Sequence, residues 1–109
     1  MDKLLSMIGI AMKAGCAVTG EAACLDSVKK GKARLCIIAS DASYNTKKRL
    51  KDKCGFRDID FFEYGDKESM GHCLGKNKIS VVCIKNENFT VQLKRLWEQN
   101  SCSFQNLGV

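Results

Sequence analysis

The side chains that could carry out covalent or proton-transfer chemistry in this chain are one histidine and seven cysteines. His72 is followed directly by Cys73, a pair that could serve as a general base beside a nucleophile. Neighbouring residues on a helix point about 100° apart, so these two side chains would not face each other. We therefore interpret His72 as a half-exposed helix residue and Cys73 as a core residue.

The cysteines are spaced too widely for a local metal or redox motif. No two lie within three residues of each other, so there is no C-x-x-C pair for zinc or thiol exchange. Several stand in apolar runs, where a free thiol packs as a small hydrophobic group. We expect these thiols to be reduced, because seven cysteines cannot pair completely within the chain. No stretch approaches the ~20 apolar residues of a membrane span, so we expect a cytoplasmic protein. Phosphate-loop and dinucleotide motifs are missing from the sequence, and no His/Cys/Asp cluster has metal-ligand spacing, so we predict no catalytic residue and no metal.

Basic residues outnumber acidic ones by 18 to 12, which gives a net charge of +6 and favours a polyanionic partner. One group surrounds the end of a predicted helix and comprises Lys29, Lys30, Lys32 and Arg34. A second runs from Lys47 to Lys53, and we interpret it mainly as a solvated helix face. Aromatic residues are only 7% of the chain, so sequence-tolerant base stacking is not indicated.

Helical and strand-like patterns alternate along the chain. Helical spacing covers residues 4–12, 20–30, 43–53, 66–75 and 89–97, and apolar runs of strand length cover 17–19, 35–39, 59–64 and 79–84. This alternation predicts an α/β protein in which helices cover both faces of one sheet, a three-layer α-β-α sandwich. We expect a single domain over residues 1–99, followed by a polar C-terminal tail, 100–109, that is frayed.

Three segments occur in an order typical of one family: VTGE at 18–21, KKGKA at 29–33 and LCIIASDAS at 35–43. With NTKK at 45–48 and LGK before the last apolar strand, they resemble the kink-turn RNA-binding ribosomal proteins of the L7Ae/L30e superfamily. Among these proteins, the likeness is greatest to the bacterial YlxQ-type branch. It runs from about residue 4 to residue 97 and implies a small mixed sheet of about four strands, without catalysis or cofactor.

The resemblance also implies which residues contact RNA. In the family, the start of the second helix enters a sharply bent RNA at tandem sheared G·A pairs, and a loop before the last strand covers an extruded nucleotide. A leading glycine permits close approach of RNA, and the free amides of a helix start suit phosphate and base acceptors, although simple helix capping would also explain that glycine. The implied RNA-binding residues are Thr19, Gly20, Glu21, Ala22 and Ala23, then Lys29 and Lys32, then Asp41, Ala42 and Ser43, and finally Lys76, Asn77, Lys78, Ile79 and Ser80. Among them we expect Ile79 to form an apolar tip that packs on a base.

Two departures from the family pattern bear on affinity. Strong binders carry Asn-Glu where this chain has Ala22 and Ala23, and a lysine where it has Asp26. Losing a bidentate base contact costs about 1–3 kcal/mol of discrimination, so the sequence predicts weaker and less selective binding. We expect a monomer whose partner is structured RNA, either a kink-turn or ribosomal RNA within the ribosome. We expect no binding to a membrane. The alternatives are a protein-interaction module with the same fold that has lost specific RNA recognition, and a thiol-dependent enzyme or redox sensor.

Overall fold

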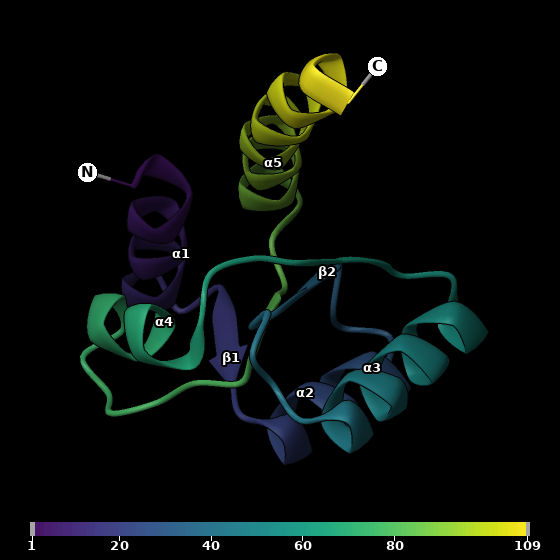
Figure 1. The fold of residues 1–109 in the computed structure, drawn as a ribbon. Coiled ribbons are helices and arrows are strands. Elements are labelled where there is room, and N and C mark those ends of the chain that lie inside the picture. The colour runs from purple at the N-terminus through teal and green to yellow at the C-terminus, as the bar shows by residue number, and fades with distance from the viewer. Residues whose placement is uncertain (1, 109) are drawn as a thin grey trace.

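Helices and strands alternate along the computed structural model, which describes residues 2–108 and, among these, the side chains of residues 2–99. Figure 1 shows the chain path from the N-terminal helix to the long C-terminal helix. In chain order the elements are α1 (Lys3–Lys13), β1 (Ala17–Thr19), α2 (Glu21–Lys29), β2 (Leu35–Ile38), α3 (Tyr44–Arg57), β3 (Asp60–Glu63), α4 (Lys67–Cys73), β4 (Val81–Ile84) and α5 (Glu87–Gly108).

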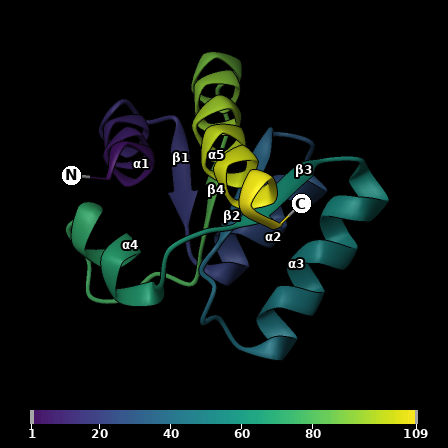
Figure 2. The same cartoon turned by 45° about the horizontal axis from the view of Figure 1, so that its top comes forward.

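The four strands form one mixed sheet in the order β1-β4-β2-β3. β4 is antiparallel to both β1 and β2, whereas β2 and β3 are parallel. The register pairs Thr19 with Val82 and Ile38 with Val81, so β1 and β2 end where β4 begins. α2 follows β1 directly and α3 follows β2 after a short turn, so both helices start at this end of the sheet (Figure 2). The predicted mixed, four-stranded sheet is confirmed.

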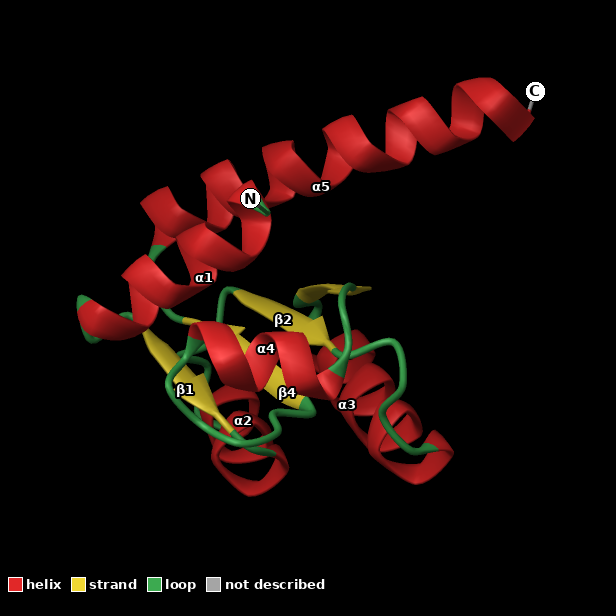
Figure 3. Ribbon diagram, turned by 60° about the vertical axis from the view of Figure 1, so that its left-hand side comes forward, coloured by secondary structure: helices red, strands yellow, loops and turns green. Residues whose placement is uncertain are grey.

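Helices cover both faces of the sheet. α1 and α5 lie on one face, and α2 and α3 lie side by side on the other, while α4 packs beside α1 (Figure 3). β2 and β4 are buried along their whole length, as expected for central strands covered on both faces. On the α5 side, the rings of Phe62 and Trp97 stack with their centroids 4.9 Å apart. The predicted three-layer sandwich is confirmed.

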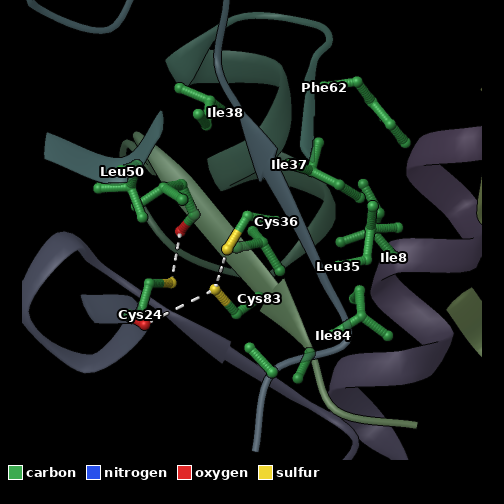
Figure 4. Packing of buried hydrophobic residues seen from close by; sticks show 14 of the residues in the cluster. Ile8, Cys24, Leu35, Cys36, Ile37, Ile38, Leu50, Phe62, Cys83 and Ile84 are labelled. Carbon is green, nitrogen blue, oxygen red and sulfur yellow. Dashed lines mark hydrogen bonds between the residues drawn. The ribbon is translucent and has the colours of Figure 1, made fainter. Parts of the chain in front are cut away.

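Strand alternation divides the core between the two faces. Leu35 and Ile37 point toward α1, whereas Cys36 and Cys83 point toward the thiol of Cys24 on α2 (Figure 4). The six cysteines whose side chains are described are free thiols. Four of them are fully buried, as predicted for cysteines that act as small apolar residues: Cys24, Cys36, Cys54 and Cys83.

Element boundaries differ from the predicted ones most clearly at three places. α5 continues to Gly108, past the predicted end of the last helix at residue 97. α3 continues to Arg57, four residues past Lys53, and stops where Asp58 adopts a left-handed conformation with φ 58°. β4 begins at Val81 because the amide of Ile79 donates to the carbonyl of Lys67 on α4 instead.

The predicted tail, 100–109, falls within the last turns of α5 and at residue 109. Its side chains lie outside the described residues, so the expected fraying remains a prediction. Among the described residues, no helix has the length and apolar character needed to cross a membrane.

Candidate nucleic-acid interface

Hydrogen bonds gather three of the predicted RNA-binding segments at the end of the sheet where α2 and α3 begin. The amide of Gly20 donates to the carbonyl of Val81 at 3.1 Å, which joins the start of α2 to β4. The amide of Ala39 donates to the carbonyl of Ser80 at 2.8 Å, which joins the turn before α3 to the loop before β4. Residues 19–23, 41–43 and 76–80 therefore lie next to one another, and their exposed members form one surface.

The start of α2 differs from every other helix start among the described residues. The other four helices are each capped by a side chain that accepts a backbone amide: Asp2 from Leu5, Ser43 from Thr46, Asp66 from Ser69 and Asn86 from Phe89. α2 begins at Gly20, which offers no side chain and makes no side-chain cap. One helix start is therefore left uncapped, and it lies on the surface defined above.

Only a glycine suits the backbone that precedes α2. Gly20 has φ 93° and ψ 149°, a region that L-residues rarely enter. The first intrahelical bond runs from the amide of Cys24 to the carbonyl of Gly20, so the amides of Glu21, Ala22 and Ala23 have no carbonyl one turn earlier. A Cβ built on Gly20 would meet no atom within 4 Å, so the space beside this helix start is open. These amides can donate hydrogen bonds to an anionic or carbonyl oxygen.

Glu21 uses its side chain to hold α2 against α3. Its carboxylate accepts a hydrogen bond from the hydroxyl of Thr46 at 2.9 Å and pairs with the guanidinium of Arg49 at 2.5 Å. These partners are 25 and 28 positions away, and sequence analysis did not identify them. The carboxylate of Glu21 is thus engaged within the protein, and its backbone amide is what it offers to a ligand.

Ala22 and Ala23 are exposed, as a contact surface requires, but their methyl groups cannot hydrogen-bond to bases. Asp26, one turn further along α2, pairs with Lys30 at 3.2 Å. The acid that was expected to repel phosphate is therefore compensated by a neighbouring lysine. The i, i+4 spacing of these two residues could have revealed the pair from the sequence.

The loop before β4 combines exposed polar residues with a buried isoleucine. Lys76, Asn77 and Lys78 are exposed. Ile79 is only 7% exposed and belongs to the core cluster, so the expectation that it forms an apolar tip on the surface is wrong. The cause is its backbone bond to α4, which draws the residue inward. Ser80 is half-buried and receives the amide of Ala39.

Gly71 allows the same loop to lie directly against α4. A Cβ on this buried glycine would overlap the carbonyl of Asn77. The amide of Lys76 also donates to the carbonyl of Gly71 at 2.7 Å, which fixes the start of the loop. Sequence analysis did not single out Gly71, because its importance depends on a chain segment that folds back onto it.

The polar residues of the turn before α3 serve as caps. The carboxylate of Asp41 accepts the amide of Lys67 at the start of α4, at 2.9 Å. Ser43 caps α3, and Ala42 between them is buried at 8% exposure. These predicted contact residues build the surface and leave only part of their polar atoms for a ligand.

Lys29 and Lys32 lie at the other end of the sheet. α2 spans nine residues, about 13 Å, from the uncapped start to Lys29. The amide of Arg34, just beyond Lys32, donates to the carbonyl of Ile84 at the far end of β4. The structure does not bring these lysines together with the other predicted RNA-binding residues. Both side chains are exposed and make no ion pair within the described part of the chain.

Nearly all of the surplus positive charge belongs to the segment that contains α2, β2 and α3. Residues 21–58 hold ten Lys and Arg against five Asp and Glu, a surplus of +5 out of +6 for the whole chain. Many basic residues of α3 form surface ion pairs, as the interpretation of a solvated helix face implies: Lys47 and Lys51 with Glu63, Lys48 with Asp52, and Arg49 with Glu21. Within this segment α3 is the most basic element, with six Lys and Arg against one Asp, so the face covered by α2 and α3 carries more positive than negative side chains.

Acid should weaken the fold in part through Glu63. Hydrogen bonds and charge from Lys51 and Lys47 hold the pKa of Glu63 below its ordinary value of 4.5. A lowered folded-state pKa stabilises the protein above the unfolded pKa, and this contribution is lost as pH falls through the folded value. We expect Glu63→Gln to lose less stability than the wild type when pH is lowered from about 5 to about 3.

Urea unfolding followed at several pH values measures this effect. Lys51→Met should reproduce part of the change, because it removes the donor with the largest influence on Glu63. Identical acid dependence in the wild type and Glu63→Gln would contradict the assignment.

The described histidine and cysteines differ in their exposure to solvent. His72 is exposed, and Cys73 is half-buried instead of forming part of the core; burial raises the pKa of the Cys73 thiol. Cys36 and Cys83 have sulfur atoms 2.6 Å apart, and hydrogen bonds from Cys54 and Cys83 lower the pKa of Cys36. This thiol cluster is fully buried, whereas a reactive cysteine needs access. Over the described residues, no group of three or more potential ligands could hold a metal ion.

Comparisons with known protein sequences agree with one another. Residues 2–93 match the model of the ribosomal protein L7Ae/L30e/S12e/Gadd45 family. The chain is 34% identical over 97 residues to RNA-binding protein YlxQ of Enterococcus faecium, which covers 89% of this chain and 93% of the relative. It is 28% identical over 87 residues to RNA-binding protein YlxQ of Bacillus subtilis, covering 80% and 87% of the two chains.

Solved structures share the fold. A Bacillus halodurans protein described as having unknown function superposes with a TM-score of 0.85 at 35% identity, over 88% of this chain and 97% of the other. The Giardia lamblia 15.5kD RNA binding protein superposes with a TM-score of 0.72 at 21% identity, over 88% and 82%. The second likeness concerns the fold alone.

Proposed function

Because this chain belongs to the ribosomal protein L7Ae/L30e/S12e/Gadd45 family, we propose that it binds structured RNA through the uncapped start of α2. Its relatives from Enterococcus faecium and Bacillus subtilis are described as RNA-binding proteins. The observation that carries the proposal is Gly20, which leaves three amides and open space at the only uncapped helix start in the described chain. RNA presents phosphate and base oxygens, which accept hydrogen bonds from such amides.

The finer proposal is that the RNA is a kink-turn or a similar sharply bent element. The uncapped start of α2 and the loop 76–80 are separated only by the Gly20–Val81 hydrogen bond, so one bent RNA could contact both. Lys76 and Lys78 supply positive charge at the edge of the RNA-binding surface. The basic residues on the face of α2 and α3 add a long-range attraction for RNA. In this proposal the protein acts as a cytoplasmic monomer without catalysis, and ribosomal RNA is a candidate target.

Binding to a kink-turn and to a straight duplex of equal length tests this proposal. We expect the kink-turn to bind more tightly, although Ala22 and Ala23 limit the difference. If about four phosphates are contacted, log K should fall against log salt with a slope of about −3.6. Equal affinity for both RNAs would reduce the interaction to non-specific charge attraction, and a flat salt response would contradict phosphate binding.

A protein-interaction role is favoured by one observation, the exposed methyl groups of Ala22 and Ala23 at the place where base-reading side chains would stand. Affinity capture with and without nuclease distinguishes the two roles. Partners that survive complete RNA removal would favour the protein-interaction role, whereas their loss would favour RNA binding.

A further inference from the structure

A groove between α2 and α3 is lined by apolar and basic side chains that the proposed kink-turn contact does not use. We define the α2–α3 groove by its lining residues Leu25, Arg49, Asp52, Lys53 and Phe56, which enclose about 460 Å³. Phe56 is 84% exposed, although it is a large apolar residue on a small domain. An aromatic ring left in water beside a groove is suited to a flat apolar partner.

The α2–α3 groove is continuous with the uncapped start of α2. Leu25 lies four residues, about 6 Å, along the helix from Glu21. Arg49, on the groove wall, pairs with the carboxylate of Glu21 at 2.5 Å. A strand that leaves an RNA held at the helix start could therefore follow α2 into the groove.

The charges around the α2–α3 groove favour a nucleic-acid strand. Asp52 lines the groove, but Lys48 pairs with it at 3.0 Å, so its charge is compensated. Lys53 makes no ion pair within the described residues and is the cation beside Phe56. The segment 21–58, which contains both helices, carries the surplus of +5. In a nucleotide bound here, the base can stack on the aromatic ring while its phosphate lies near the lysine.

We propose that the α2–α3 groove binds an unpaired nucleotide of a strand that extends from the folded RNA, with its base stacked on Phe56 and its phosphate near Lys53. The proposal rests on the proposed function, because it places the folded RNA at the start of α2. Stacking tolerates any base, so this contact adds affinity without adding a sequence preference. Through this contact, the protein recognises the single strand beside the bend as well as the bend itself.

Fluorescence anisotropy with matched RNAs tests the groove separately from the helix start. The RNAs are a blunt-ended kink-turn, the same kink-turn with a short uridine overhang on either stem, and the free uridine strand. We expect one overhang to raise the affinity of the wild type about fivefold or more. Phe56→Leu should lose this gain and Phe56→Tyr should keep it, because stacking needs a ring and not only an apolar side chain.

Val91→Ala is the matched control, since Val91 is 46% exposed on α5 and α5 covers the opposite face of the sheet. It should keep the overhang gain, and every variant should bind the blunt kink-turn as the wild type does. The proposal is overturned if neither overhang adds affinity. It is also overturned if Phe56→Leu keeps the gain, a result expected if the groove binds a protein instead of RNA. Failure of the proposed function would appear differently, as a blunt kink-turn bound no better than a duplex.

Discussion

Replacing Gly20 by valine should weaken binding to kink-turn RNA by about a hundredfold or more while the protein remains folded. Gly20 has φ 93° and ψ 149°, which a β-branched residue cannot adopt without strain. The backbone would rotate to relieve that strain and would turn the amides of Glu21, Ala22 and Ala23 away from their ligand. Two lost hydrogen bonds to charged oxygens cost about 3–6 kcal/mol in binding, whereas the strain costs the fold about 1–3 kcal/mol.

The matched control for this substitution is Gly15→Ala. Gly15 also has a positive φ, 74°, and a Cβ there would meet nothing within 4 Å. It lies between α1 and β1, at the opposite end of the sheet from the RNA-binding surface. We expect a comparable loss of thermal stability and unchanged RNA affinity. Equal affinity losses in the two variants, or normal binding by Gly20→Val, would show that the start of α2 is not the contact.

Replacing Ala22 by asparagine together with Ala23 by glutamate should raise the affinity for a kink-turn about tenfold or more. Both positions are exposed at the start of α2, so the longer side chains can extend into solvent without repacking the core. The resemblance to strong kink-turn binders implies that these side chains hydrogen-bond the guanines of the sheared pairs. One bidentate contact contributes about 1–3 kcal/mol of discrimination.

A straight duplex is the control for the double substitution, because it lacks sheared pairs. Its affinity should fall slightly, since the added glutamate brings a negative charge close to phosphates. Asp26→Lys should behave differently and raise the affinity for both RNAs, because it replaces a paired acid with a cation. An equal gain for duplex and kink-turn in the double variant would mean that no base contact had been restored.

The fold could be predicted from the sequence because its central strands are marked locally. The apolar runs that contain Leu35–Ile38 and Val81–Ile84 indicate strands buried on both faces, and helical stripes lie between them. Strand ends were less certain, because the backbone of Ile79 bonds to α4 instead of the sheet. A pattern of apolar residues cannot predict this hydrogen bond, because Lys67, whose carbonyl accepts it, lies 12 positions earlier in the chain.

The candidate interface could be predicted only in part, because some of its residues act through distant partners. Gly20 was identifiable from its place before a helical stripe. The role of Glu21 was not, because Thr46 and Arg49 approach it only when α2 and α3 pack together. Lys29 was expected to support binding at the helix start, although the length of α2 separates the two. Whether the predicted residues touch RNA remains a prediction for the substitutions above to test.

The contact between Gly71 and the loop 76–78 has a consequence for which molecule changes shape on binding. The carbonyl of Asn77 occupies the place where a side chain of α4 would otherwise stand, so the loop cannot move closer to α4. Its two ends are tied to the carbonyls of Gly71 and Lys67. We therefore expect this loop to keep its place when RNA binds, so that the change of shape occurs in the nucleic acid. The bound and free forms of this loop should superpose closely, and an RNA already folded into its bend should associate faster than one that must still bend.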